Sequence, residues 1–253
     1  YSDGNLDLEF DKAGNLWLGM MNQTGAARFD RKTEKFTFFP IPKEMLDDET
    51  QTAMVAPVNS HVDGKAWINS AEKPVVSRFD IATGKYEGWI APFKDRPKGE
   101  AHSAYGVYTD SKNNAYLMDF PSQYVWKIDA KTGAVTSFKT PSEYSRPRRG
   151  RMDSEDRFWF GEYFGDKIAM FDAKTKTFKE WATPKWTAPY TASVPNKKGH
   201  VFAPSNSSDR VFRLDPKTGE VLAYLMPTMN FDTKEVSIDP ISGTAAPPSG
   251  ELI

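Results

Sequence analysis

Short apolar stretches with an aromatic residue near their centre alternate with polar turns along the chain. The aromatic residue returns at steps of 50, 49, 43 and 43 residues, at Trp17, Trp67, Tyr116, Trp159 and Phe202. The Asp that opens a D-x-x-T turn follows the same steps, at Asp30, Asp80, Asp129, Asp172 and Asp215. Two independent markers with one spacing over five copies indicate an array of one supersecondary unit. A period of 43 to 50 residues is typical of propellers or solenoids.

The fourth copy shows the unit most clearly. After a turn at 154–156, an aromatic-rich segment at 157–162 is followed by apolar segments at 167–172 and 177–181. Short strands with turn signals this close together predict a four-stranded antiparallel meander. The copies run over about 5–42, 51–93, 102–141, 146–184 and 186–227, with a partial sixth at 232–246.

These copies predict an all-β fold: a β-propeller of four-stranded antiparallel blades in a single domain, 1–253. The chain holds five clear blades and a partial sixth, and we expect six or seven in the closed form. The D-x-x-T pattern favours a turn, because an Asp carboxylate can accept hydrogen bonds from the backbone N–H groups two or three residues later. The turns at 30–34 and 172–176 lack the Gly that closes the other three, and we expect them to be strained or differently shaped.

Composition narrows the function. The 33 basic and 34 acidic residues give no electrostatic case for nucleic acid, and no apolar stretch is long enough to span a membrane. The one basic run, Arg146 to Arg151, is open to two interpretations, a solvated loop or a functional cluster. The 253 residues contain no cysteine, which excludes disulfides and thiolate chemistry and fits a periplasmic or secreted protein.

The wording D-x-x-G-N-L-W-L, then R-F-D-x-x-T-x-K-F and Pro, spans Asp11 to Pro40 and returns in the later copies. It resembles the repeat of the streptogramin lyases (virginiamycin B lyase-like proteins). The resemblance implies a seven-bladed propeller and a Mg²⁺-dependent opening of a macrocyclic lactone by elimination. It also implies a site at the central mouth, with a His at the start of the innermost strand in two late blades. Carboxylates nearby would hold the cation.

Placing those family positions on this chain gives no histidine. The His position falls on Tyr105, Arg148, Thr191 and Lys234 in successive blades. The carboxylate that follows the aromatic strand falls on Asp119, Glu162 and Ser205. We therefore predict no catalytic residue. Tyr105, Arg148, Thr191, Lys234 and Ser205 are candidate ligand-binding residues at the mouth, and Asp119 with Glu162 are candidate ligands for Mg²⁺ or Ca²⁺. His102, three residues before Tyr105, is the best placed of the three histidines and joins the ligand-binding candidates.

Two functions stay open. The first is an extracytoplasmic binding or interaction module that takes a small polar ligand or a protein partner at the channel mouth. The second is a metal-assisted C–O lyase, or a lactone or ester hydrolase, with Mg²⁺ or Ca²⁺ between Asp119 and Glu162. In a third interpretation these side chains bind no ligand. The carboxylates and cations at the mouth would then pair with one another and line a water-filled channel.

Overall fold

The computed structural model describes residues 5–20, 24–45, 52–70, 75–90 and 104–227, together with the strands Ser237–Ile238 (β20) and Ala245–Ala246 (β21). The chain forms two compact units, Tyr1–Phe138 (unit 1) and Lys139–Ile253 (unit 2). Each unit is described by itself below.

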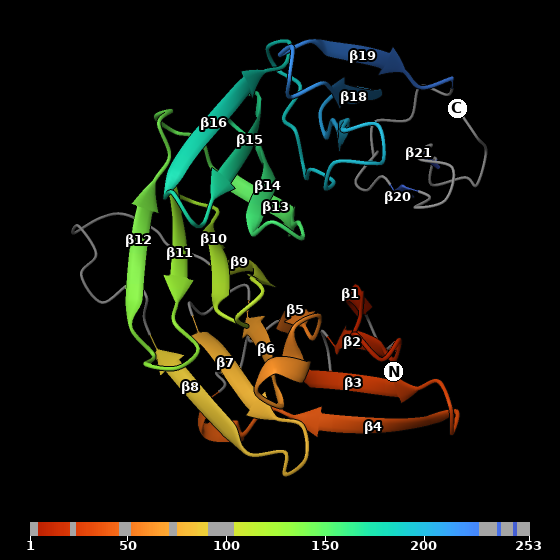
Figure 1. Ribbon diagram of the computed structural model, residues 1–253, viewed down its shortest axis with the longest axis vertical. Helices are drawn as coiled ribbons and strands as arrows, with labels where there is room; N and C mark the ends of the chain where they lie inside the picture. Colours follow the sequence, from red (N-terminus) through yellow and green to blue (C-terminus); the bar gives the residue numbers. More distant parts are fainter. Residues whose placement is uncertain are drawn as a thin grey trace. The chain divides into compact units, whose positions relative to one another are not determined.

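Unit 1 contains three four-stranded antiparallel sheets with strands in sequential order (Figure 1). Blade 1 consists of β1 (Asn5–Phe10), β2 (Leu16–Met20), β3 (Gly25–Asp30) and β4 (Lys35–Pro40). Blade 2 consists of β5 (Thr52–Ala56), β6 (Lys65–Ser70), β7 (Val75–Asp80) and β8 (Tyr86–Ile90). Blade 3 consists of β9 (Ala104–Thr109), β10 (Ala115–Asp119), β11 (Tyr124–Ile128) and β12 (Val135–Lys139), whose last residue begins unit 2. Two 3-10 turns, Lys43–Met45 (η1) and Ser60–Val62 (η2), complete the described elements of the unit.

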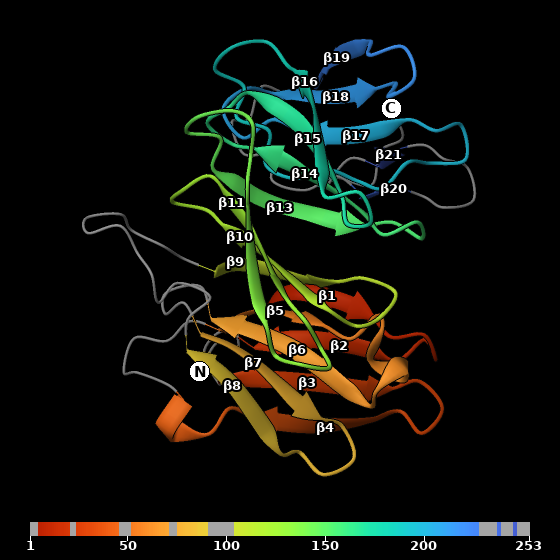
Figure 2. The ribbon, with the colours of Figure 1, turned by 60° about the vertical axis from the view of Figure 1, so that its left-hand side comes forward.

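Unit 2 contains one four-stranded sheet and one three-stranded sheet (Figure 2). Blade 4 consists of β13 (Pro147–Met152), β14 (Arg157–Glu162), β15 (Lys167–Asp172) and β16 (Thr177–Ala182). Blade 5 consists of β17 (Val201–Pro204), β18 (Arg210–Leu214) and β19 (Val221–Leu225). β20 pairs with β21 in a two-stranded sheet, within the expected sixth copy.

Blade 5 departs from the predicted four strands. The segment before β17 donates to it from Tyr190 N to the Pro204 carbonyl at 3.0 Å and from Ser193 N to the Phe202 carbonyl at 2.9 Å. Pro204 has no N–H to return the first bond, and Phe202 N bonds the Ser193 hydroxyl at 3.0 Å in place of a carbonyl, so a regular ladder does not form. The segment before β17 therefore runs beside β17 without forming a regular strand.

The apolar core lies between successive blades, as thin sheets that share their faces require. In unit 1, Trp17 and Phe39 of blade 1 pack with Ile68 and Phe79 of blade 2. In unit 2, Trp159 and Met170 of blade 4 pack against a set of blade 5 residues, Val201, Ala203, Phe212 and Leu214. The recurring aromatic residue of the sequence is thus part of both of these cores, as Trp17 in unit 1 and as Trp159 in unit 2.

The D-x-x-T turns have the predicted bonds, for example from Lys32 N and Thr33 N to Asp30 Oδ1, both at 2.9 Å. Backbone donors of this kind lower the pKa of the Asp that opens each of the five turns. The prediction of strain is confirmed at Glu34 and Lys176, whose φ angles are 56° and 60° in the left-handed region. The alternative of a different shape is wrong. Lys176 N bonds the Asp172 carbonyl at 2.8 Å, as Gly84 N bonds the Asp80 carbonyl.

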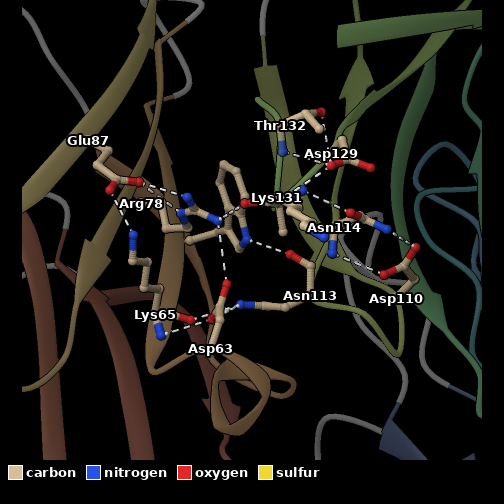
Figure 3. A network of polar contacts seen from close by, with 12 residues as sticks. Asp63, Lys65, Arg78, Glu87, Asp110, Asn113, Asn114, Asp129, Lys131 and Thr132 are labelled. Carbon is tan, nitrogen blue, oxygen red and sulfur yellow. Dashed lines mark hydrogen bonds and ion pairs between the residues drawn. The ribbon is translucent and has the colours of Figure 1, made fainter. Parts of the chain in front are cut away.

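A polar cluster joins blades 2 and 3, and we call it the Arg78 clasp (Figure 3). The Arg78 side chain is 8% exposed and lies with its guanidinium 5.0 Å from the centre of the Trp67 ring. It donates to Glu87 Oε2 at 2.7 and 3.2 Å and to the Ala130 carbonyl of blade 3 at 2.6 Å. Asn113 of blade 3 donates back, to Asp63 Oδ1 at 2.8 Å and to the Lys65 carbonyl at 3.0 Å. The clasp fills the space beside the core of these two blades with hydrogen-bonded side chains.

Candidate functional site

The candidate site lies at one end of unit 2, which we call the loop end. It consists of four segments: 140–146, which leads into blade 4, and 163–166, 183–190 and 205–209, which follow strands of blades 4 and 5. In the sequence, three of these segments combine turn residues with large aromatic side chains.

Hydrogen bonds tie these segments to one another. The Ser145 carbonyl accepts bonds from Phe164 N and Gly165 N, both at 3.2 Å. The Asp166 carboxylate accepts bonds from the backbone N–H groups of three consecutive residues, Trp186, Thr187 and Ala188, at 2.8 to 3.0 Å. Two of these three residues, Trp186 and Ala188, have positive φ, so the loop forms a concave cradle of N–H groups around the carboxylate.

Asn206 adds the fourth segment, donating from Nδ2 to the Tyr163 hydroxyl at 2.7 Å and from its backbone N to the Ala188 carbonyl at 3.0 Å. The loop end is therefore braced before any ligand arrives, which lowers the entropy cost of binding.

Three large aromatic side chains project from this braced surface. Tyr144 is 78% exposed, Phe164 is 57% exposed and Trp186 is 85% exposed. Tyr144 and Trp186 have φ angles of 53° and 63°, which cost non-glycine residues of this size about 1–2 kcal/mol each. Strain of this kind persists where the surrounding structure holds it, and it concentrates at functional sites.

Arg148 on β13 lies between two tyrosine rings behind this surface. Its guanidinium carbon is 4.7 Å from the Tyr163 ring centre and 4.1 Å from that of Tyr190. The buried Arg149 lies 5.5 Å from the same Tyr190 ring, and Arg146 lies 4.2 Å from the Phe164 ring. Cation–π contacts at these distances orient the guanidinium groups. The basic run of the sequence is therefore a packed cluster, so the solvated-loop interpretation is wrong for these three arginines.

Glu162, at the end of β14, is fully buried, and neither carboxyl oxygen has a hydrogen-bond partner in the part of the chain that the structure describes. Burial raises the pKa of Glu162 to about 9, and the nearby negative charge of Glu180 adds to the rise. Burial alone would also raise the pKa of Glu180, but bonds from Lys167 Nζ and Ser142 Oγ, both at 2.6 Å, outweigh it and lower that pKa. At neutral pH Glu162 is therefore protonated, while Glu180 keeps its charge.

The other predicted residues are distributed as follows. In unit 1, Tyr105 packs on Phe120, with ring centres 5.4 Å apart, and the fully buried Asp119 accepts a long bond of 3.4 Å from Trp126 Nε1. In unit 2, Ser205 is buried and bonds the Thr187 carbonyl and Ser208 Oγ, so its hydroxyl holds the loop together.

Thr191 is half-buried and follows Tyr190. His102 and Lys234 lie outside the described residues. Asp119 and Glu162 belong to different units, so the predicted cation site between them stays a prediction. Among the described residues, no group of three or more His, Cys, Asp or Glu side chains could hold a metal ion. No described helix is long and apolar enough to cross a membrane.

Comparison with protein-family models finds no match, and neither does comparison with curated proteins. Solved structures do match. A catalytically inactive variant of the virginiamycin B lyase from Staphylococcus aureus, with quinupristin, is 15% identical with a TM-score of 0.76, over 92% of this chain and 74% of the lyase.

The chain has the β-propeller fold of the streptogramin lyases. The extracellular domain of a putative one component system from B. thetaiotaomicron shares this fold at 15% identity and a TM-score of 0.71, over 98% of this chain and 33% of that one. A structure of a nidogen/laminin complex matches at 9% identity and a TM-score of 0.62, over 88% of this chain and 81% of that one. At these identities the likeness concerns the propeller fold alone.

Sequence reasoning found Arg148 and Glu162 but not the aromatic residues around them. Tyr163 and Phe164 directly follow Glu162, and Trp186 and Tyr190 lie in the segment that leads to blade 5. Phe164, Trp186 and Tyr190 have no aromatic residue 43 positions earlier in the repeat, whereas Tyr163 has Phe120 there. Their departure from the repeat could have identified them in the sequence, because residues that differ between copies are not required by the common blade structure.

Proposed function

We propose that this propeller is an extracytoplasmic interaction module, and that its partner binds the loop end of unit 2. The observation that carries the proposal is the set of three exposed aromatic side chains, Tyr144, Phe164 and Trp186, on three segments that are hydrogen-bonded to one another. Exposed aromatic residues on a rigid surface are typical of the energetically dominant positions in protein interfaces. The location is inferred from the absence of cysteine and from the fold shared with an extracellular domain.

The charges at the loop end favour an acidic partner. Arg146, Arg148 and Lys185 contribute positive charge, and Glu143 is an exposed carboxylate among them. Of the other acids, Glu162 is protonated at neutral pH, Asp166 is bonded by three N–H groups, and Asp209 is buried rather than exposed to a partner. A partner segment that offers carboxylates and an apolar surface would complement both features of the site.

The competing function is metal-assisted lyase or hydrolase chemistry with Asp119 and Glu162 as ligands. Two observations count against it. In unit 2 the positions of the lyase histidines carry Arg148, Thr191 and Lys234. A guanidinium, a hydroxyl and an ammonium group are all poor general bases at neutral pH. Glu162 holds a proton below about pH 9, so a cation would first have to displace that proton. A thermal shift with Mg²⁺ or Ca²⁺ that is lost in Glu162→Gln would revive this function.

The test uses a display library of random peptides selected on the immobilised chain. We expect the selected peptides to be enriched in Asp and Glu, and to lose at least about tenfold in affinity for the variant Tyr144→Ala/Phe164→Ala/Trp186→Ala. The matched control is Phe10→Ser/Phe36→Ser, which removes two exposed aromatic side chains from blade 1 and should leave binding unchanged. Peptides that bind the triple variant as well as the original chain would refute the proposal.

A further inference from the structure

The Arg78 clasp depends on a position that recurs in every blade. The residue paired with the second-strand aromatic residue is Arg28, Arg78, Lys127 and Arg213 in blades 1, 2, 3 and 5. In blade 4 the residue paired with Trp159 is Met170. Four blades thus place a cation beside the interblade core, and blade 4 places a thioether there.

Two further clasp residues are replaced at the same junction. Glu87, which binds Arg78 across β7 and β8, corresponds to Lys179, which pairs with Met170. Asn113, three residues before Tyr116, corresponds to Gly199, three residues before Phe202. A Cβ atom added at Gly199 would meet nothing within 4 Å, so the position that Asn113 occupies between blades 2 and 3 borders open space between blades 4 and 5.

The consequence is a groove of about 260 Å³, which we call the Trp groove. It is lined by residues of both blades: Arg157, Trp159, Met170, Lys179, Trp181, Pro195, Gly199, Pro216 and Lys217. It lies at the end of unit 2 opposite the loop end, beside the turns 153–157, 172–177 and 215–219.

The base of the Trp groove is apolar. Trp159 and Met170 are buried there, and the rings of Trp159 and Trp181 are stacked 5.8 Å apart with 16° between their planes. Trp159 Nε1 is already bonded to Asp153 Oδ2 at 2.9 Å, so this indole offers the groove its carbon atoms and no donor. Pro195 and Pro216 add two rigid walls. A flat apolar ring fits such a slot better than a polar group does.

The rim is positively charged. Three of the nine lining residues are cations, and none of the nine is acidic. Arg157 is bound by Asp153 at 2.7 Å and by Glu155 at 3.1 Å, so its charge is already balanced. Lys179 and Lys217 are exposed, and no ion pair joins either of them to another described residue. Two ammonium groups above an aromatic slot are complementary to a single carboxylate on a flat ring.

We propose that the Trp groove is a second binding site, for a small aromatic carboxylate. The ring lies in the slot formed by Trp181, Met170 and the two prolines, and the carboxylate lies between Lys179 and Lys217. The volume suits one or two fused rings, since it is slightly below the range of about 300–1,000 Å³ for pockets that hold drug-sized ligands. This site is independent of the interaction surface at the loop end.

The probe is indole-3-acetate, and its binding to the purified chain is followed by NMR titration. We expect saturable binding with a dissociation constant of about 1 mM or tighter, as the size of the ligand allows. Indole-3-acetamide, which has the same shape and no charge, should bind at least about fivefold more weakly, as should indole-3-acetate to the variant Lys179→Ala/Lys217→Ala. The control variant is Lys174→Ala/Lys176→Ala, which removes two exposed lysines of the adjacent turn that do not line the groove.

The decisive variant is Met170→Arg/Lys179→Glu, which restores the residue types of the clasp. Because the introduced guanidinium would occupy the groove, we expect binding of indole-3-acetate to fall at least about tenfold with the fold retained. Circular dichroism and a thermal melt confirm that the variant is folded. No saturable binding to the original chain at about 10 mM would overturn the proposal, and so would equal binding to the variant with the restored clasp.

Discussion

Two junctions between neighbouring blades, made from the same repeat, have opposite character. Between blades 2 and 3, Arg78 reaches across Trp67 to the Ala130 carbonyl and the junction is filled. Between blades 4 and 5, Met170 lies beside Trp159 at the same paired position and a groove remains. The D-x-x-T turn bonds and the strands that carry Arg78 and Met170 are alike in both places, although blade 5 has an irregular segment where blade 3 has β9. A few side chains on matched strands therefore decide whether a junction holds the blades together or offers a cavity.

The two regions also differ in the pKa of a glutamate side chain. Glu87 in the clasp receives bonds from Lys65 and Arg78, and these donors lower its pKa. Glu162 in blade 4 is buried without such a donor, and its pKa is raised to about 9. The clasp gains stability from a charge, whereas blade 4 keeps its buried acid neutral.

Removing the clasp should have the largest effect. Arg78→Met gives blade 2 the residue type of blade 4. It leaves the Ala130 carbonyl without the Arg78 donor and leaves Glu87 with Lys65 as its remaining cation. We expect a loss of about 3 kcal/mol in the free energy of unfolding of unit 1, measured by urea denaturation. The matched control is Arg28→Met, because the Arg28 Nε has no partner among the described residues and should cost under about 1 kcal/mol. Equal losses in the two variants would show that the clasp has no special role.

Glu162→Gln should have the next largest effect, and it should depend on pH. In the folded chain the Glu162 carboxyl keeps its proton up to about pH 9, while in the unfolded chain it loses the proton near its ordinary pKa of 4.5. The folded state therefore binds more protons in this window, so its stability falls as pH rises from about 5 to 9. The amide removes this penalty, and we expect a gain of about 2 kcal/mol at pH 8 and none near pH 4.

The measurement is urea unfolding of both proteins at pH 4, 6 and 8. Glu143→Gln, at an exposed position of the loop end, is the control for loss of one negative charge. Parallel pH profiles for Glu162→Gln and the original chain would contradict the burial of a neutral acid in blade 4.

Asn113→Gly tests one position of the two junctions, because it places in the Arg78 clasp the residue type that Gly199 provides in the Trp groove. The change removes the bonds to Asp63 and to the Lys65 carbonyl, and it relieves a φ angle of 59°. The net loss should be about 1 kcal/mol. The reverse change, Gly199→Asn, meets open space and a φ of 84° that Asn tolerates, so its effect should be within about 0.5 kcal/mol of zero. A larger cost for Gly199→Asn would mean that the groove is not open at this point.

The smallest effect concerns the turns beside the two junctions. Gly84 closes the turn of blade 2 with φ at 70°, and Lys176 closes the equivalent turn of blade 4 with φ at 60°. Lys176→Gly should therefore stabilise the chain by about 0.5 kcal/mol, and Gly84→Ala should destabilise it by about 1 kcal/mol. Both values come from the same denaturation assay. A destabilising Lys176→Gly would indicate a contact of the lysine side chain that outweighs the strain.

Much of the fold could be predicted from the sequence because two markers recur with the same spacing. The aromatic residue of the second strand and the Asp of the last turn together located each blade along the chain. The Asp at the first turn then links to that aromatic residue, as Asp11 accepts from Trp17 Nε1 at 3.0 Å and Asp153 from Trp159 Nε1 at 2.9 Å. The interrupted strand before β17 could not be predicted, because it depends on the missing N–H of Pro204 and on a side-chain bond of Ser193, which the hydrophobic pattern does not display.

The candidate site was predicted less well, and for a physical reason. Repeat spacing located Arg148 and Glu162, but the Tyr163 and Tyr190 rings reach Arg148 through irregular segments whose path follows from the Asp166 cradle. The Trp groove could have been found in the sequence, since Met170 breaks a series of cations at one repeat position. What the sequence could not provide is that the cation fills the junction in blade 2, which only the contacts of Arg78 reveal.

A crystal structure of the Met170→Arg/Lys179→Glu variant tests most directly whether side chains alone decide between a filled junction and a groove. The account predicts that the introduced guanidinium stacks on Trp159, bonds the introduced carboxylate and the Pro216 carbonyl, and closes the Trp groove, with the blades unchanged. A guanidinium that points into solvent above a groove of the original size would contradict it.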